Sequence, residues 1–69
     1  MQPVLYSHRL KTVLQHTVRE LGLTLVLNDQ QSLLPLRENE AVIRETAALL
    51  GINVNIEISA DSTTVTFFA

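Results

Sequence analysis

The 69-residue sequence contains no cysteine and only two glycines and two prolines. Without cysteine, the chain can form neither a disulfide nor a thiolate zinc site, two devices that stabilise many small domains. Two glycines are too few for a glycine-rich loop that holds phosphate. Charged residues reach only 17% of the chain, whereas apolar residues reach 46%. Because a domain of this size buries only about 60% of its unfolded surface, we expect self-association to contribute to its stability.

Basic residues are few and scattered. The five of them are Arg9, Lys11, Arg19, Arg37 and Arg44, and with seven acidic residues they give a net charge of −2. Nucleic-acid binding usually needs a basic stripe, so it is not expected here. No apolar run approaches the roughly 20 residues that cross a membrane, and the first residues lack the pattern of a secretory signal. We therefore expect a cytoplasmic protein with a single small domain over residues 1–69, and no membrane contact.

An amphipathic helix is predicted in the first third of the chain. Its apolar residues recur at the spacing of one helix face, and they are Leu10, Val13, Leu14, Val18 and Leu21. Ser7 suits the N-cap, and Gly22 suits the position just after the helix. Pro3 would allow an earlier start, and a short strand at Val4 to Tyr6 is a third alternative.

A short strand and a second helix follow. Residues 23–27 alternate leucine with Thr24 and Val26, which is the period of a strand, and Asn28 and Asp29 end it. Pro35 disfavours helix at the residue before it, so the second helix should begin at or after Pro35.

The second helix has its own apolar stripe. The residues expected to be buried are Val42, Ile43, Ala47 and Leu50. Glu40 and Arg44 stand four apart, as an exposed ion pair on a helix does. Gly51 should end the helix.

The clearest pattern is a C-terminal β-hairpin. Apolar residues at 52, 54, 56 and 58 alternate with polar residues at 53, 55, 57 and 59, and residues 60–62 favour a turn. Residues 63–68 are rich in β-branched and aromatic side chains. Val65 and Phe67 should face the core, and Phe68 should face the other side, near Val26.

These elements predict an α+β fold in the order α-β-α-β-β. A strand-helix-strand unit with a right-handed crossover makes its two strands parallel, and the hairpin adds an antiparallel third. We therefore expect a small three-stranded mixed sheet, two helices packed on one face and a C-terminal β-hairpin. Such a sheet leaves open edges and one uncovered face.

Residues with catalytic chemistry are present but not grouped. His8 and His16 are eight apart on one helix, too far to share a metal ion. The serines lack the glycines of a nucleophile elbow, and Glu38, Glu40 and Glu45 fit a solvated helix face. We expect no enzyme activity, no cofactor and no metal.

Residues 45–53, with the sequence ETAALLGIN, resemble the first helix and turn of helix-turn-helix families. That resemblance implies a DNA-binding transcriptional regulator. Such families place a polar recognition helix next, whereas this chain continues as Val54-Asn55-Ile56-Glu57-Ile58, which alternates as a strand. The continuation departs from the family pattern and puts DNA binding in doubt.

Our leading hypothesis is a noncatalytic protein-protein interaction module, a small regulator, adaptor or inhibitor that forms a homodimer. Its predicted partner-binding residues are on the polar side and aromatic end of the hairpin: Asn53, Asn55, Glu57, Thr64, Thr66 and Phe68. Leu33, Leu34 and Leu36 are second candidates, because they are unusually apolar for a loop. The alternatives are the DNA-binding regulator and a small accessory subunit of a larger complex.

Overall fold

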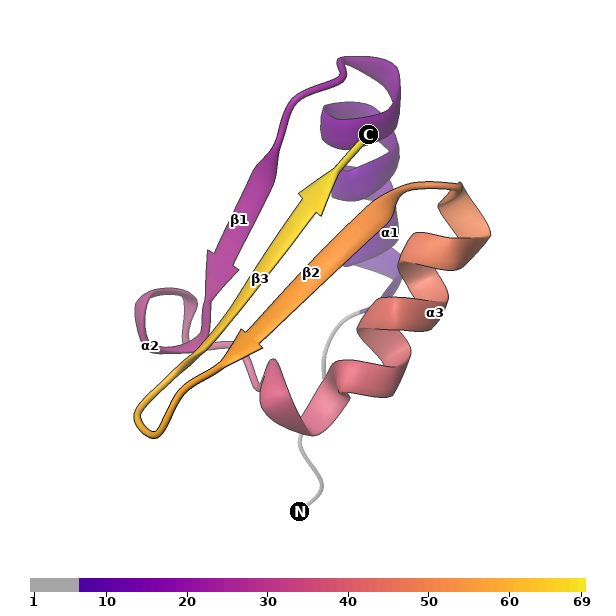
Figure 1. Cartoon of the computed structure of the whole chain (residues 1–69). Helices are drawn as coiled ribbons and strands as arrows, with labels where there is room; N and C mark the ends of the chain where they lie inside the picture. Colours follow the sequence, from indigo (N-terminus) through magenta and orange to yellow (C-terminus); the bar gives the residue numbers. More distant parts are fainter. Residues whose placement is uncertain (1–6) are drawn as a thin grey trace.

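The computed structural model describes residues 7–69, and its elements are shown in Figure 1. In chain order they are α1 (Ser7–Val13), the π-helix η1 (Leu14–Glu20), β1 (Leu25–Asn28), α2 (Asp29–Ser32), the 3-10 helix η2 (Arg37–Asn39), α3 (Glu40–Leu50), β2 (Asn53–Ile58) and β3 (Thr63–Phe68). The alternatives at Pro3 and at Val4 to Tyr6, and the side chain of Ser7, lie outside this description.

The first predicted helix exists, but its second half is wider than an α-helix. The N–H of Leu21 donates to the C=O of His16, five residues back, at 3.1 Å. In this wider turn, residues four apart stay on one face, and Leu10, Leu14 and Val18 are buried. Leu21 and Val13, predicted for the same stripe, are exposed. Gly22 has φ +68°, which confirms its place after the helix.

β1 is shorter than predicted: it covers Leu25–Asn28, whereas the predicted strand covered residues 23–27. The Asn28 side chain accepts hydrogen bonds from the N–H groups of Gln30 and Gln31, and so begins the short helix α2, which was not predicted. Leu33 ends α2 with φ 58°, in the left-handed region.

The second predicted helix is α3. It begins after Pro35, as predicted, and buries Ile43, Ala47 and Leu50 together with Thr46. Val42, predicted for the same stripe, is exposed. The predicted ion pair is present, with Arg44 Nη2 3.2 Å from Glu40 Oε1. Gly51 ends the helix with φ +69°, as predicted.

The three strands form an antiparallel sheet in the order β1-β3-β2, so the predicted mixed sheet is wrong. β3 lies between the other two strands and pairs with both, for example through Val65, which stands opposite Leu27 and Ile56. β1 and β2 run in the same direction but are not neighbours, so no parallel pair forms. The predicted hairpin of β2 and β3 is confirmed.

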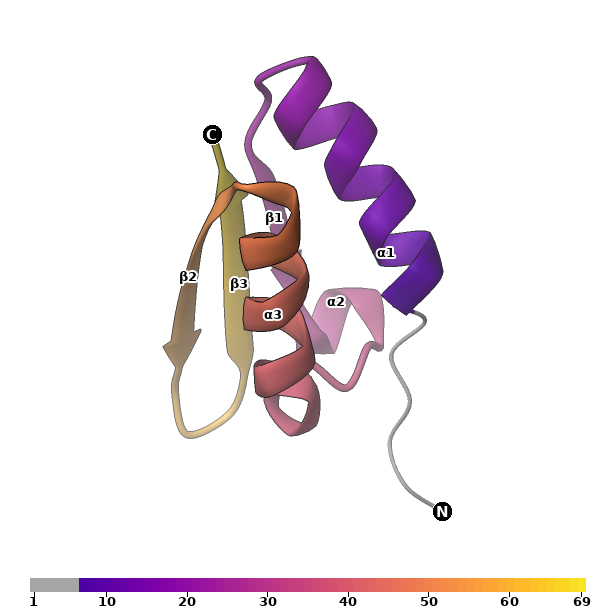
Figure 2. The ribbon, with the colours of Figure 1, turned by 90° about the vertical axis from the view of Figure 1, so that its right-hand side faces the viewer.

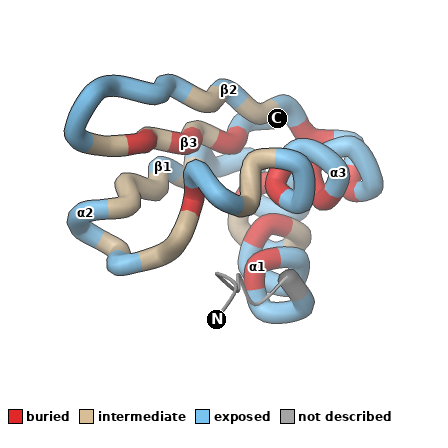
Figure 3. The backbone as a smooth tube through the Cα atoms, turned by 90° about the horizontal axis from the view of Figure 1, so that it is seen from below, coloured by how far each residue is buried: buried red, intermediate tan, exposed pale blue. Residues whose placement is uncertain are grey.

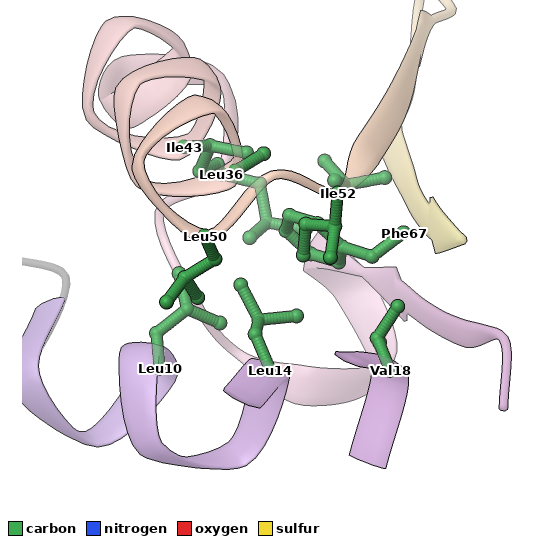
Figure 4. Packing of buried hydrophobic residues seen from close by; sticks show 10 residues of the cluster. Leu10, Leu14, Val18, Leu36, Ile43, Leu50, Ile52 and Phe67 are labelled. Carbon is green, nitrogen blue, oxygen red and sulfur yellow. The ribbon is translucent and has the colours of Figure 1, made fainter. Parts of the chain in front are cut away.

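The helices α1 and α3 lie on the same side of the sheet (Figure 2). Leu10, Leu14 and Val18 point from the first helix toward side chains of α3 and the sheet (Figure 4). The core cluster consists of Leu10, Leu14, Val18, Leu36, Ile43, Ala47, Leu50, Ile52, Val65 and Phe67. Figure 3 shows that buried positions recur along α1, α3 and β3, whereas β2 and the hairpin turn are mostly exposed or half-buried.

Candidate docking surface

The six predicted contact residues lie together on one face of the sheet. They form three cross-strand pairs between β2 and β3: Asn53 with Phe68, Asn55 with Thr66, and Glu57 with Thr64. The intervening β3 residues Thr63, Val65 and Phe67 are buried toward the helices. Because side chains alternate along a strand, the six residues face away from the helices.

β1 extends this surface by two residues that sequence reasoning did not select for contact. Val26 stands opposite Thr66, and Asn28 stands opposite Thr64. Val26 is 57% exposed and Phe68 is 40% exposed, so two apolar side chains lie diagonally across neighbouring strands. The alternation of Val26 with Leu25 and Leu27 was the signal that places it here. We call the set of Val26, Asn28, Asn53, Asn55, Glu57, Thr64, Thr66 and Phe68 the outer face.

Hydrogen bonds hold several polar side chains of the outer face in place. Asn28 Nδ2 donates to Thr64 Oγ1 at 3.0 Å, across β1 and β3. Asn55 Nδ2 donates to Glu57 Oε1 at 3.3 Å, along β2. Glu57 is the one charged residue of the outer face. This surface is therefore largely neutral, partly ordered and apolar at one end.

The second candidate contact residues, Leu33, Leu34 and Leu36, do not lie on one surface. Leu33 is 86% exposed and Leu34 is half-buried, but Leu36 is fully buried, so its assignment to a contact surface is wrong. The chain turns inward after Pro35, and Leu36 packs into the core cluster. A periodic pattern could not reveal this burial, because Leu36 precedes the helix.

Polar residues elsewhere hold local structure. His8 and His16 are exposed, and His16 Nδ1 lies 3.2 Å from Glu20 Oε2. Ser32 Oγ donates to the C=O of Asn28 at 2.6 Å. Over residues 7–69, no three histidine or carboxylate side chains come close enough to hold a metal ion. In the same part of the chain, no helix has the length and apolar character needed to cross a membrane.

The segment that resembles a helix-turn-helix keeps only its first part. α3 ends at Leu50, and after Gly51 the chain enters β2. A strand therefore occupies the position where the recognition helix of that family would begin.

The sequence matches no family model, no curated protein and no solved structure at a significant level.

Proposed function

We propose that this chain is a noncatalytic protein-protein interaction module, a small cytoplasmic regulator, adaptor or inhibitor that works as a homodimer through its outer face. The main support is the gathering of seven neutral or apolar residues and one carboxylate on a sheet face that α1 and α3 leave uncovered (Figure 2). An antiparallel sheet can expose a polar face to water, but Val26 and Phe68 add exposed apolar surface to this one, which favours a partner.

The residue types of the outer face suit a protein contact. Interface cores are poor in charge and rich in aromatic residues, and Phe68 with Val26 supplies an apolar anchor. Asn28 and Asn55 are already hydrogen-bonded to their neighbours, so less side-chain freedom is lost when a partner docks.

A second copy of the chain is the occupant that best fits this face. Asparagine and threonine side chains both donate and accept hydrogen bonds, so two identical surfaces can satisfy each other. Glu57 is at the hairpin end and Phe68 is at the other end. A twofold axis across the strands brings each Glu57 near the Phe68 end of the other copy, which keeps the two carboxylates apart.

The area of the outer face sets how strongly two copies are expected to associate. At ordinary strand and residue spacings, three strands of this length cover roughly 300 Å². Two such faces fall below the roughly 1,200 Å² of total surface that stable complexes bury, in the range of transient contacts. We therefore expect a monomer-dimer equilibrium that responds to concentration.

Sedimentation velocity over a wide concentration range tests the proposal. The wild-type weight-average mass should rise from monomer toward dimer, and Phe68→Ser and Val26→Ser should keep the chain monomeric. Leu49→Ser is the matched control, because Leu49 is equally apolar and is exposed on α3, away from the outer face. A wild-type protein that stays monomeric at its highest soluble concentration contradicts the proposal, as does a Phe68→Ser variant that dimerises normally.

A further inference from the structure

A cavity of about 280 Å³ opens between α1 and β1, on the helix side of the sheet. Leu10 and Val13 of α1 line one wall, Leu25 and Leu27 of β1 line the other, and Leu34 closes the end near α2. We call this site the β1 groove. Since Leu25 and Leu27 point to the side of the sheet opposite to Val26, the β1 groove is separate from the outer face.

Beside the groove, β1 is an edge strand with unused backbone groups. In the hairpin, the N–H of Ser59 donates to the C=O of Ser62, so Ser62 directs its backbone toward β2. The backbone N–H and C=O groups of successive residues in a strand point to opposite sides, so those of Thr63 must point toward β1. The N–H of Thr63 indeed donates to Asp29 Oδ1 at 3.0 Å. By the same alternation, the backbone groups of Thr66 point toward β2. Val26 stands opposite Thr66, so it directs its own N–H and C=O away from β3.

We propose that the β1 groove binds an extended peptide segment of a partner protein, which adds to β1 as an antiparallel strand. A peptide residue opposite Val26 exchanges two backbone hydrogen bonds with it. The peptide residues on either side then stand opposite Leu25 and Leu27, with their side chains pointing into the groove. The chemistry recognised is therefore an extended backbone with apolar side chains at alternate positions.

The volume of the β1 groove and the charge of Arg9 limit which peptides fit it. The cavity is slightly smaller than the roughly 300 to 1,000 Å³ usual for drug-sized ligands, and it suits aliphatic side chains. Arg9 also lines it, and its guanidinium makes no ion pair with any residue in the range 7–69. β1 runs from the end of the first helix back toward its start (Figure 1), so an antiparallel peptide has its N-terminal end beside Arg9. A carboxylate side chain at that end of the peptide would meet this guanidinium.

The test is an NMR titration of labelled protein with an N-acetylated ten-residue peptide in which leucine alternates with threonine and which begins with an aspartate. Saturable shifts are expected at the backbone amide of Val26 and at the methyl groups of Val13, Leu25 and Leu27. N-methylation of the threonines removes the N–H groups that face Val26 and should abolish binding. N-methylation of the leucines, whose N–H groups face outward, should leave binding intact.

Two pairs of protein variants complete the test. Val13→Glu should weaken binding by at least about tenfold, because the peptide would bury an unpaired carboxylate. Leu21→Glu, on the same helical segment but outside the groove, should bind as wild type. Arg9→Glu should weaken binding of the aspartate peptide more than that of the same peptide with asparagine in its place, whereas the exposed control Lys11→Glu should not distinguish them. Phe68→Ser should bind as wild type, which keeps this result independent of the proposed dimer.

Absence of saturable binding would overturn the proposal. Equal binding by the two N-methylated peptides, or shifts confined to outer-face residues of β2 and β3, would overturn it as well, because neither agrees with strand addition at β1.

Discussion

Asn28 is the residue at which β1 becomes α2, and its side chain serves both elements. Oδ1 accepts the N–H groups of Gln30 and Gln31 at 3.0 and 3.3 Å, and Nδ2 reaches Thr64 on β3. The same amide thus starts a helix and orders part of the outer face. Asp29 adds a second link, because its carboxylate accepts the N–H of Thr63 beyond the end of β1.

Leu33 is the residue whose conformation conflicts most with its type. It has φ 58°, and no other non-glycine residue in the described range has a positive φ. A left-handed conformation costs an L-residue roughly 1 kcal/mol or more, and Leu33 loses little packing when truncated because it is 86% exposed.

We predict that Leu33→Gly raises the free energy of unfolding by about 0.5 to 1 kcal/mol, because glycine adopts this conformation freely. Urea denaturation of dilute protein measures the change. Gly51→Ala is the mirror control, with φ +69°, and should destabilise the fold by a similar amount. A loss of stability in Leu33→Gly would show that the leucine side chain makes a contact in solution.

At the scale of elements, α3 is fixed at its carboxyl end by the first helix. Arg19 Nη1 donates to the C=O of Leu50 at 3.0 Å, which places a cation at the negative end of the α3 dipole. The link joins η1 to α3, and it is unlike the exposed Glu40 to Arg44 pair, which lies within one helix.

We predict that Arg19→Ala lowers the free energy of unfolding by about 1 to 2 kcal/mol, because a charge-assisted bond at a helix terminus is lost. Arg44→Ala should cost only about 0.3 to 0.5 kcal/mol, the usual value of an exposed pair four residues apart. Both are measured by urea denaturation. Equal losses in the two variants would mean that the Arg19 contact has no special role.

The hairpin could be predicted from sequence, but the sheet order could not. β2 and β3 each alternate within their own residues and are joined by a short turn, so their pairing is a local property. The pairing of Leu27 with Val65 joins distant segments, and the alternation of β1 is the same whichever neighbour it has. The outer-face residues of the hairpin could be predicted for the same local reason, whereas the contribution of Val26 required the sheet order.

The burial of residues outside a regular helical or strand period could not be predicted from the sequence either. Leu36 lies between Pro35 and η2, outside any apolar period of the sequence, yet it is fully buried. Leu21 fits an α-helical stripe, but it follows the wider turns of η1 and is exposed. Val13 fits the same stripe, but it lines the open groove between α1 and β1. In both cases tertiary packing decided what the local pattern left open.

At the scale of the whole molecule, stability depends on one core without a disulfide. Leu14 is fully buried between the first helix and the other elements, beside Leu50 and Leu10 (Figure 4). Single domains are typically stable by about 0.05 to 0.15 kcal/mol per residue, so a chain of this length is expected to have a free energy of unfolding of about 3 to 10 kcal/mol.

We predict that Leu14→Ala lowers the free energy of unfolding by about 2 to 5 kcal/mol, because it removes packed methyl groups and leaves a cavity. Leu49→Ala, at an exposed position of α3, should change it by less than about 0.5 kcal/mol. Thermal and urea unfolding followed by circular dichroism give both values. Similar stability of the two variants would contradict the placement of Leu14 in the core.

The most direct test of the proposed dimer is an isotope-filtered nuclear Overhauser measurement on a mixture of labelled and unlabelled chains at high concentration. Contacts between copies are predicted from the Phe68 ring and the Val26 methyl groups to outer-face side chains of the other copy, including the Thr64 and Thr66 methyl groups, and they should disappear in Phe68→Ser. No contact between copies, or contacts only from side chains of α3, would contradict docking through the outer face.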